Sequence, residues 1–359
     1  MNDKPNWKSR FKGLLSVVAF SSVATLAGAQ EYVAVDLGVF VPTSMNDSGT
    51  IAGYSSLGGD YHAITYRNGT ITDLGTLGGT LSEAYAVNNS GAVTGYAYTP
   101  DGSRHAFSYS NGVMTDLGTL GGSYADGQGI NSAGTVVGTS LTAGNSYHAF
   151  SYGNGMMTDL GTLGGPWSFA WGLNNTGIIV GEANTVNATH AFSYSNGVMT
   201  DLGTLGGSLS IAYHVNDTGT IVGNSDTFSG ISHAFSYSNG IMTDLGTLGG
   251  GYPDTFGSDV AGINNAGTIV GRAYASDGSI SAFLYSNGTM MDLNTLVNID
   301  GVILTDAEAI NNAGQIVASN GAGEVYLLSP VPELSNGALL AAGAATLLAL
   351  RRRPRASLH

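Results

Sequence analysis

Histidine and aspartate recur together along this chain, and their spacing is the first sign of possible chemistry. The histidines are spaced 43, 43, 42 and 43 residues apart, and Ser281 follows 48 residues after the last. They are His62, His105, His148, His190 and His233. A metal site needs several ligands at one point, whereas one histidine per repeat places these far apart. We therefore favour a structural hydrogen bond inside each repeat, because buried polar groups are nearly always paired. The predicted pairs are His105–Asp116, His148–Asp159, His190–Asp201 and His233–Asp244.

The element that positions each pair is a predicted β-hairpin. In residues 105–122, large side chains alternate with small ones, which is the period of a strand. Asn111-Gly112 predicts a type I′ turn, which needs positive φ at both central residues. This turn places Tyr109 opposite Met114 and Phe107 opposite Asp116. His105 is then diagonal to Asp116, roughly 7–8 Å away. The same Asn-Gly pair recurs at residues 68, 154, 196, 239 and 287.

A second hairpin alternates with the first. Its pattern is apolar-Asn-x-x-Gly-x-apolar-apolar-Gly, with Ala318 in place of the last glycine in the final copy. Asparagine can bond the backbone of its own turn, and glycine can adopt the left-handed conformation. The seven copies have their asparagine at positions 46, 88, 131, 174, 216, 264 and 311.

Four short strands in each period of about 43 residues predict an all-β fold, a seven-bladed β-propeller of four-stranded blades. The Asp-Leu-Gly strand reaches seven copies only if residues 32–38 are counted. We therefore predict that this N-terminal strand pairs with Val325–Leu328 and closes the last blade, since an open ring would leave unpaired edges. The alternative is an open β-solenoid.

The repeats differ most after their Gly-Gly pairs, where aromatic residues lie beside acidic ones. Such side chains suit stacking and hydrogen bonding to sugar rings, but they could also pack the crossover to the next blade. The candidate ligand-binding residues are Glu83, Tyr85, Tyr124, Asp126, Trp167, Phe169, Trp171 and Tyr213; His214, Tyr252 and Asp254 lie in the same segments. Residues 250–261 and 294–308 lengthen two repeats, and we predict that they are surface loops.

Composition excludes several classes of function. The chain has no cysteine, so packing alone must hold it together. Residues 30–330 contain three arginines, no lysine and 23 acidic residues. That charge would repel phosphate backbones, so we do not expect nucleic-acid binding. The sequence has no Gly-x-Ser-x-Gly motif, phosphate-binding loop, His-Glu-x-x-His motif or acidic calcium loop, and we predict no metal or cofactor.

Both ends of the chain resemble export signals. Residues 1–29 combine a basic start, an apolar run and Ala27-Gly28-Ala29, as in a cleaved signal peptide; an uncleaved anchor is the alternative. After a repeat domain of residues 30–330, the tail of residues 331–359 has an apolar stretch at 337–350. Fourteen helical residues span about 21 Å against roughly 30 Å of bilayer core, and flanking residues could extend this transmembrane helix. The following Arg351, Arg352 and Arg353 would keep the C-terminus cytoplasmic.

Two families share these patterns. The repeat from His105 to Gly122 resembles the HAF-type extracellular repeats of bacteria, over nearly all of residues 31–329. The tail resembles the PEP-CTERM sorting signal, with Pro332 and Glu333 as its motif, but it has Leu334 where that family usually has proline. The second resemblance implies a Gram-negative bacterium, an exosortase that cleaves near the motif after transient anchoring in the membrane, and a link to exopolysaccharide or biofilm matrix.

These observations lead to two functional hypotheses. The first is a non-enzymatic protein of the cell surface or extracellular matrix that binds glycan, exopolysaccharide or other matrix partners. The second is an extracellular polysaccharide hydrolase or lyase that uses Glu83, Asp126 or Asp254 as acid and base. Such an enzyme needs two carboxylates about 5 to 9 Å apart.

Overall fold

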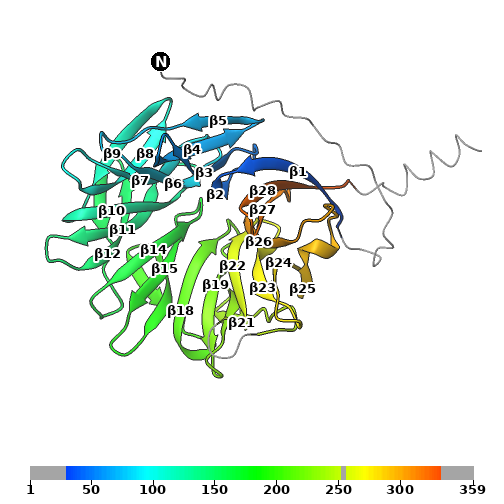
Figure 1. The fold of residues 1–359 in the computed structure, drawn as a ribbon. Coiled ribbons are helices and arrows are strands. Elements are labelled where there is room, and N and C mark those ends of the chain that lie inside the picture. Colours follow the sequence, from blue (N-terminus) through cyan, green and yellow to red (C-terminus); the bar gives the residue numbers. More distant parts are fainter. Residues whose placement is uncertain (1–29, 252–255, 333–359) are drawn as a thin grey trace, which may run out of the picture.

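The computed structural model describes residues 30–251 and 256–332 (Figure 1). These residues form 28 β-strands and one short 3₁₀ helix, η2 at Leu293–Thr295. The strands make seven antiparallel meanders of four, and a single parallel bridge joins meander 2 to 3 and another joins meander 4 to 5. The described part of the chain is therefore all-β, as predicted.

The meanders follow one another along the sequence. Meander 1 contains β2 (Val41–Met45), β3 (Ile51–Leu57), β4 (Asp60–Arg67) and β5 (Thr70–Asp73). Meander 2 contains β6 (Ser82–Val87), β7 (Val93–Tyr98), β8 (Arg104–Ser110) and β9 (Val113–Gly118). Meander 3 contains β10 (Gly121–Ile130), β11 (Val136–Thr142), β12 (Tyr147–Gly153) and β13 (Met156–Asp159). Meander 4 contains β14 (Ser168–Leu173), β15 (Ile179–Asn184), β16 (Thr189–Ser195) and β17 (Val198–Asp201).

The last three meanders complete the fold. Meander 5 contains β18 (Gly206–Val215), β19 (Ile221–Thr227), β20 (Ser232–Ser238) and β21 (Ile241–Asp244). Meander 6 contains β22 (Ser258–Ile263), β23 (Ile269–Tyr274), β24 (Ile280–Ser286) and β25 (Thr289–Asp292). Meander 7 contains β26 (Leu304–Ile310), β27 (Ile316–Asn320) and β28 (Glu324–Pro330), with β1 (Tyr32–Val39) as its fourth strand.

The predicted turns and register are confirmed. Asn111 has φ 52° and Gly112 has φ 81°, and the other five Asn-Gly pairs also have positive φ at both residues. Tyr109 lies opposite Met114, and Phe107 lies opposite Asp116. The positive φ that favours asparagine and glycine at these turns fixes the pairing of the two strands.

The predicted pairing of the N-terminal strand with the last hairpin is also confirmed. Strand β1 runs antiparallel to β28, with Asp36 opposite Tyr326 (Figure 1). The first and last meanders share a core as well, in which Phe40 and Ile51 pack with Val317. An open solenoid would leave the two ends of the repeat domain apart, so this arrangement contradicts it.

The core lies between meanders. Each of meanders 2 to 6 buries one phenylalanine of its third strand completely; these are Phe107, Phe150, Phe192, Phe235 and Phe283. Phe107 packs against Ala52 and Ala63 of the preceding meander. The other four contact the preceding meander in the same way. Hydrophobic burial therefore joins neighbouring sheets and does not stay within one sheet.

The prediction of two surface loops is wrong in part. Within residues 250–261, Ser258 begins β22, and within residues 294–308, Leu304 begins β26. Leu296 and Leu304 are buried in the core of meanders 6 and 7. The added length fills the space beside η2, because its leucines gain more from burial than from exposure.

The predicted signal peptide, sorting motif beyond Pro332, transmembrane helix and arginine cluster lie outside the described residues. Among residues 30–251 and 256–332, no helix is long and apolar enough to cross a membrane.

Candidate ligand-binding face

Seven asparagines form a ring of hydrogen bonds at one end of the inner strands. The side-chain Nδ2 of each donates to the backbone oxygen of the asparagine in the next meander, as from Asn88 to Asn131 O. The last bond runs from Asn311 to Asn46 O and completes the circle. The ring consists of Asn46, Asn88, Asn131, Asn174, Asn216, Asn264 and Asn311.

The asparagine ring is a structural feature. Each Oδ1 accepts hydrogen bonds from its own turn, as Asn46 Oδ1 does from the amides of Ser48 and Thr50. The turns surround a polar cavity of about 220 Å³. Because the ring residues are the same in all seven meanders, this end offers little to distinguish one ligand from another.

The opposite half of the same hairpins is where the meanders differ. Two of the differing positions lie five and three residues before the ring asparagine. The third is on the paired strand, directly after the last glycine of the repeated pattern or, in meander 7, after Ala318. Five and three residues of strand span about 16 and 10 Å, so both positions are separated from the ring. We call them the variable face. Its members are Val41, Thr43, Tyr54, Glu83, Tyr85, Tyr96, Asp126, Gln128, Thr139, Phe169, Trp171, Glu182, Ile211, Tyr213, Asn224, Asp259, Ala261, Arg272, Asp306, Glu308 and Ser319.

A β-bulge brings the variable side chains together. In meander 2, Glu83 lies opposite Tyr96, and the register then shifts between Ala84 and Ala86. A Cβ on Gly95 would lie 1.9 Å from the backbone oxygen of Glu83, so only glycine fits there. The extra residue of a bulge bends the strand and re-aims its side chains. This explains why the apolar-apolar-Gly pattern repeats beside the variable positions of meanders 1 to 6.

Aromatic rings between residues 124 and 213 form a contiguous arc that includes three residues of the variable face and extends beyond it. Their ring centroids lie 5.0 to 6.2 Å apart between neighbours. The aromatic arc consists of Tyr124, Tyr147, Trp167, Phe169, Trp171 and Tyr213. Five of the six are predicted site residues. Tyr147 is not; it directly precedes a repeated histidine, at a position that we assigned no role.

The remaining predicted site residues gather around Arg104, which the sequence did not mark. Its guanidinium donates to both carboxylate oxygens of Asp126 and to the hydroxyl of Tyr85. It also stacks 3.4 Å from the ring centroid of Tyr96. The Tyr85 hydroxyl donates to Glu83. Burial raises the pKa of Asp126, and the charge of Arg104 opposes that shift.

Glu182 lies beside the aromatic arc with little access to solvent. The residue is only 9% exposed. Its carboxylate accepts a hydrogen bond from Trp171 Nε1 at 3.3 Å. Burial raises its pKa to about 7. The sequence did not mark Glu182, because the other six meanders have no acidic residue at the same position of their second strand.

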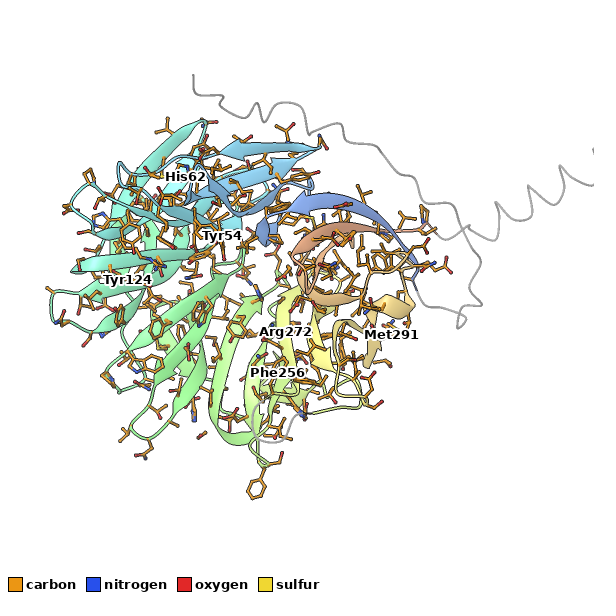
Figure 2. The ribbon with its side chains drawn as sticks, viewed as in Figure 1. Tyr54, His62, Tyr124, Phe256, Arg272 and Met291 are labelled. Carbon is orange, nitrogen blue, oxygen red and sulfur yellow. The ribbon has the colours of Figure 1, made fainter. Side chains whose placement is uncertain are left out.

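Meanders 6 and 7 contribute a second charged cluster. Arg272 donates to Asp259 at 3.1 Å and to Asp306 at 3.2 Å. Its guanidinium carbon lies 5.3 Å from the ring centroid of Phe256. Figure 2 shows Arg272 and Phe256 together, while Tyr54 and Tyr124 lie on other meanders. Because Tyr54 lies near both Glu83 and Glu308, whose charges add to burial in raising its pKa, the variable face continues through meander 1.

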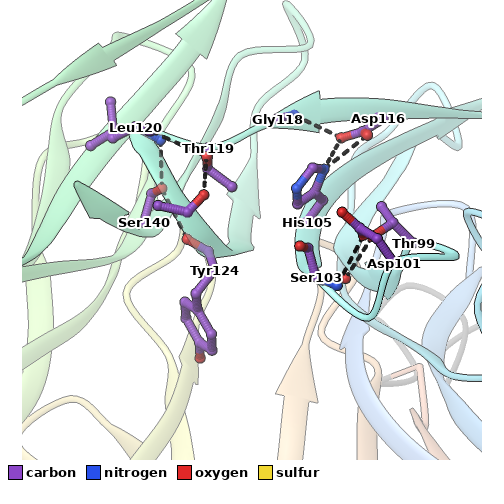
Figure 3. A network of polar contacts seen from close by, with 12 residues as sticks. Thr99, Asp101, Ser103, His105, Asp116, Gly118, Thr119, Leu120, Tyr124 and Ser140 are labelled. Atoms are coloured by element: carbon purple, nitrogen blue, oxygen red, sulfur yellow. Dashed lines mark hydrogen bonds and ion pairs between the residues drawn. The ribbon is translucent and has the colours of Figure 1, made fainter. Parts of the chain in front are cut away.

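The predicted histidine–aspartate pairs are in contact, but they are not buried. His105 Nδ1 lies 2.8 Å from Asp116 Oδ1 (Figure 3), and the other three predicted pairs and His62–Asp73 have the same geometry. The aspartate side chains are 41–46% exposed. The premise that these polar groups are buried is therefore wrong, because the fourth strand is an edge that solvent reaches.

Each pair stabilises a turn. Asp116 Oδ1 also accepts a hydrogen bond from the amide of Gly118 (Figure 3). The pairs stay one to a meander, and no group of three or more metal-binding side chains occurs in residues 30–251 and 256–332. Of the residues suggested as acid and base, Glu83 and Asp126 belong to the Arg104 cluster, whereas Asp254 lies outside the described residues.

Comparisons with known proteins found similar solved structures but no matching sequence family. No protein-family model and no curated protein matches this sequence. Among solved structures, TolB from Acinetobacter baumannii is 11% identical over 79% of this chain, with a TM-score of 0.47, and the chain spans 64% of that protein. The WD40 β-propeller domain of Doa1 is 15% identical over 85% of this chain and 98% of its own length, with a TM-score of 0.45. A gluconolactonase from Xanthomonas campestris is 12% identical over 84% and 90%, with a TM-score of 0.42.

Proposed function

We propose that this protein is an exported, non-enzymatic β-propeller whose variable face binds a glycan of the extracellular matrix. The observation that carries the proposal is the aromatic arc. Its rings are contiguous, and five of the six residues are half-buried while Tyr147 is exposed. The carboxyl groups of Asp126 and Glu182 accept hydrogen bonds from Tyr124 and Trp171 of the arc. Aromatic rings provide apolar surface for sugar faces, and adjacent carboxyl groups accept hydrogen bonds from sugar hydroxyls.

In this proposal the seven meanders are seven blades, and β1 completes the seventh. The pairing of β1 with β28 and the seven-membered asparagine ring support it. A closed ring would hold side chains from all blades around one axis. The variable face would then act as one surface, even though its residues come from distant parts of the chain.

Export is the second part of the proposal. The signal-like residues 1–29 would direct the repeats across the inner membrane of a Gram-negative bacterium. The PEP-CTERM-like tail would anchor the protein transiently until an exosortase processes it near Glu333. Deleting residues 331–359 should release the protein from the envelope and leave the melting temperature of the repeat domain unchanged. Retention in the envelope, or a large fall in melting temperature, would contradict this role.

One observation favours a polysaccharide hydrolase or lyase as the alternative. Glu182, with a pKa of about 7, could serve as a general acid near neutral pH. Hydrolysis by two carboxyl groups also needs a partner about 5 to 9 Å away. Release of reducing ends or unsaturated sugars from bacterial exopolysaccharide, lost in Glu182→Gln, would establish the enzyme and refute the binding protein.

A glycan array with residues 30–330 tests the binding proposal. Bound glycans should lose affinity when Trp167→Ala shortens the aromatic arc. The matched control is Phe228→Ala, which removes an aromatic ring that is 93% exposed and outside the arc. Loss of roughly tenfold is expected from one stacking residue, since such contacts contribute about 1 kcal/mol beyond area burial. Equal binding by both variants would show that the arc is not part of the binding site.

A further inference from the structure

The variable face contains a pocket between meanders 6 and 7, and a small residue creates it. Three residues before the ring asparagine, meanders 2, 4 and 5 carry Tyr85, Trp171 and Tyr213, whereas meander 6 carries Ala261. The space that an aromatic ring fills elsewhere is therefore open here. The pocket has a volume of about 330 Å³ and is lined by Asp259, Ala261, Gly271, Arg272, Asp306, Ala307 and Glu308. That volume is within the range of small-ligand sites.

The side chains of this pocket leave an excess of negative charge. Arg272 is shared between Asp259 and Asp306, so one guanidinium faces two carboxylates. Asp259 also accepts a hydrogen bond from Asn224, and Asp306 accepts one from Thr305. These two carboxylates are therefore held in place, and they neutralise the one cation.

Glu308 is the third carboxyl group of the pocket. Its Oε1 accepts a hydrogen bond from the Ser319 hydroxyl at 2.8 Å. Burial raises its pKa, with the charge of Asp306 adding to that shift and the charge of Arg272 opposing it. A cation placed in the pocket would remove this unfavourable interaction among carboxylates, whereas an anion would increase it.

The rest of the variable face offers nothing to attract an anion. Arg104, which lies beside the face, is bound by both oxygens of Asp126. The third arginine of residues 30–330, Arg67, is on β4 and is not part of the face. An acidic polysaccharide would therefore meet Glu83, Glu182 and Glu308 without a free positive side chain of that face to compensate.

From this pocket we propose that the glycan contains a hexosamine with a free amino group, and that Glu308 binds its ammonium. This inference rests on the proposed function and names the class of ligand for it. The sugar ring fills the space beside Ala261, and its hydroxyls reach Asp259 and Arg272, which have donors and acceptors at the pocket wall. The ammonium and the carboxylate form a charge-assisted hydrogen bond, which is stronger than a neutral one.

Calorimetry on the full-length chain with three oligosaccharides tests the inference. The probes are a glucosamine hexamer, its fully N-acetylated counterpart and a galacturonate hexamer. The glucosamine hexamer should bind at least tenfold more tightly than the acetylated one, because hydrogen bonds to charged groups contribute about 1.5–3 kcal/mol. Its affinity should fall as salt rises, since salt screens charge pairs that solvent reaches. The galacturonate hexamer should bind most weakly.

Two variants test the pocket itself. Glu308→Gln keeps the acceptor for Ser319 but removes the charge, and it should abolish only the preference for the free amine. Ala261→Tyr installs the ring that meanders 2 and 5 carry, and it should block the pocket without disturbing the strand. The control is Glu324→Gln, the same change on strand β28 of meander 7, where the carboxylate accepts from Asn320 outside the pocket.

The outcomes separate this inference from the proposed function. Equal binding of the amine and the acetylated hexamer, or an unchanged preference in both Glu308→Gln and Ala261→Tyr, would overturn the subsite and leave glycan binding intact. Tightest binding of the galacturonate hexamer would also overturn it. Failure of all three probes, together with an empty glycan array, would overturn the proposed function.

Discussion

Asn174 makes three side-chain hydrogen bonds within its turn and one to the next meander. Its Oδ1 accepts from Thr176 and Ile178, and its Nδ2 donates to Asn216 O at 2.9 Å. The residue is 3% exposed, and Asn174→Ala leaves the buried oxygen of Asn216 and the half-buried amide of Ile178 without their side-chain partner. Each such group costs about 1–3 kcal/mol, and we expect the variant to lose about 3 kcal/mol of unfolding free energy in urea titration.

The matched control for that variant is one residue along the same turn. Asn175 is exposed and bonds to Asp217 at the rim. Asn175→Ala should cost less than about 1 kcal/mol, because water can replace exposed partners. If the two variants were equally stable, the asparagine ring would not be holding the meanders together.

Glu182 makes stability depend on pH. Its pKa is near 4.5 in the unfolded chain and about 7 in the folded protein, because burial disfavours its charged form. The folded state therefore binds more protons between these values, and the unfolding free energy falls as pH rises through that window. The effect is on the order of 3 kcal/mol. Glu182→Gln should reduce this slope, leaving the contributions of buried carboxyl groups such as Asp126 and Glu308, and be more stable than the natural protein at pH 8, with little difference at pH 4. An unchanged slope in the variant would contradict the assignment.

Strand β1 is an element whose removal should affect the whole fold. It pairs along its full length with β28 and buries Tyr32 in the core shared by meanders 6 and 7. Deleting residues 30–39 would expose the edge of β28 and that apolar surface. We expect loss of cooperative unfolding and aggregation in size-exclusion chromatography, because uncovered strand edges pair with other chains. A monomeric, cooperatively folding deletion would show that β1 is dispensable.

Sequence reasoning was most successful where local backbone chemistry decides the structure. Asn111-Gly112 predicts both the turn and the register of its hairpin, because few residues tolerate positive φ. The count of Asp-Leu-Gly strands also predicted that residues 32–38 pair with Val325–Leu328, and Asp36 lies opposite Tyr326. That inference reaches across the whole domain, yet it needs only the rule that a strand edge requires a partner.

The candidate site was only partly predictable, because its contacts join side chains from different strands and, for Arg104, from different repeats. The aromatic and acidic residues were recognisable as departures from the repeat. Arg104 and Glu182 were not, since their partners Asp126 and Trp171 lie on other strands. The histidine pairs show the same limit, because a sequence pattern predicts the contact of His105 with Asp116 but not its exposure to solvent.

At the scale of the molecule, the two ends of the repeat domain are held side by side. The amide of Val331 donates to Glu31 O at 2.8 Å, and Gln30 Nε2 donates to Val331 O at 2.7 Å. Meander 7 is the one sheet built from both ends of the described chain. If closure depends only on pairing within a sheet, then the same closure should be possible in a different meander.

A circular permutant tests that reasoning. A short glycine-serine linker would join residue 331 to residue 30, and new ends would open between Gly144 and Asn145, in an exposed turn. Meander 3 would then be completed by β11 and β12 from opposite ends of the chain, through the register that pairs Val136 with Tyr152. We expect a folded monomer whose melting temperature is within about 5 °C of the natural order, since a domain of this size shifts by roughly 2–4 °C per kcal/mol. A permutant opened at the fully buried Val137 serves as the control and should not fold. If the Gly144 permutant also failed, pairing within one sheet would not suffice for closure, and the order in which the meanders form would have to matter as well.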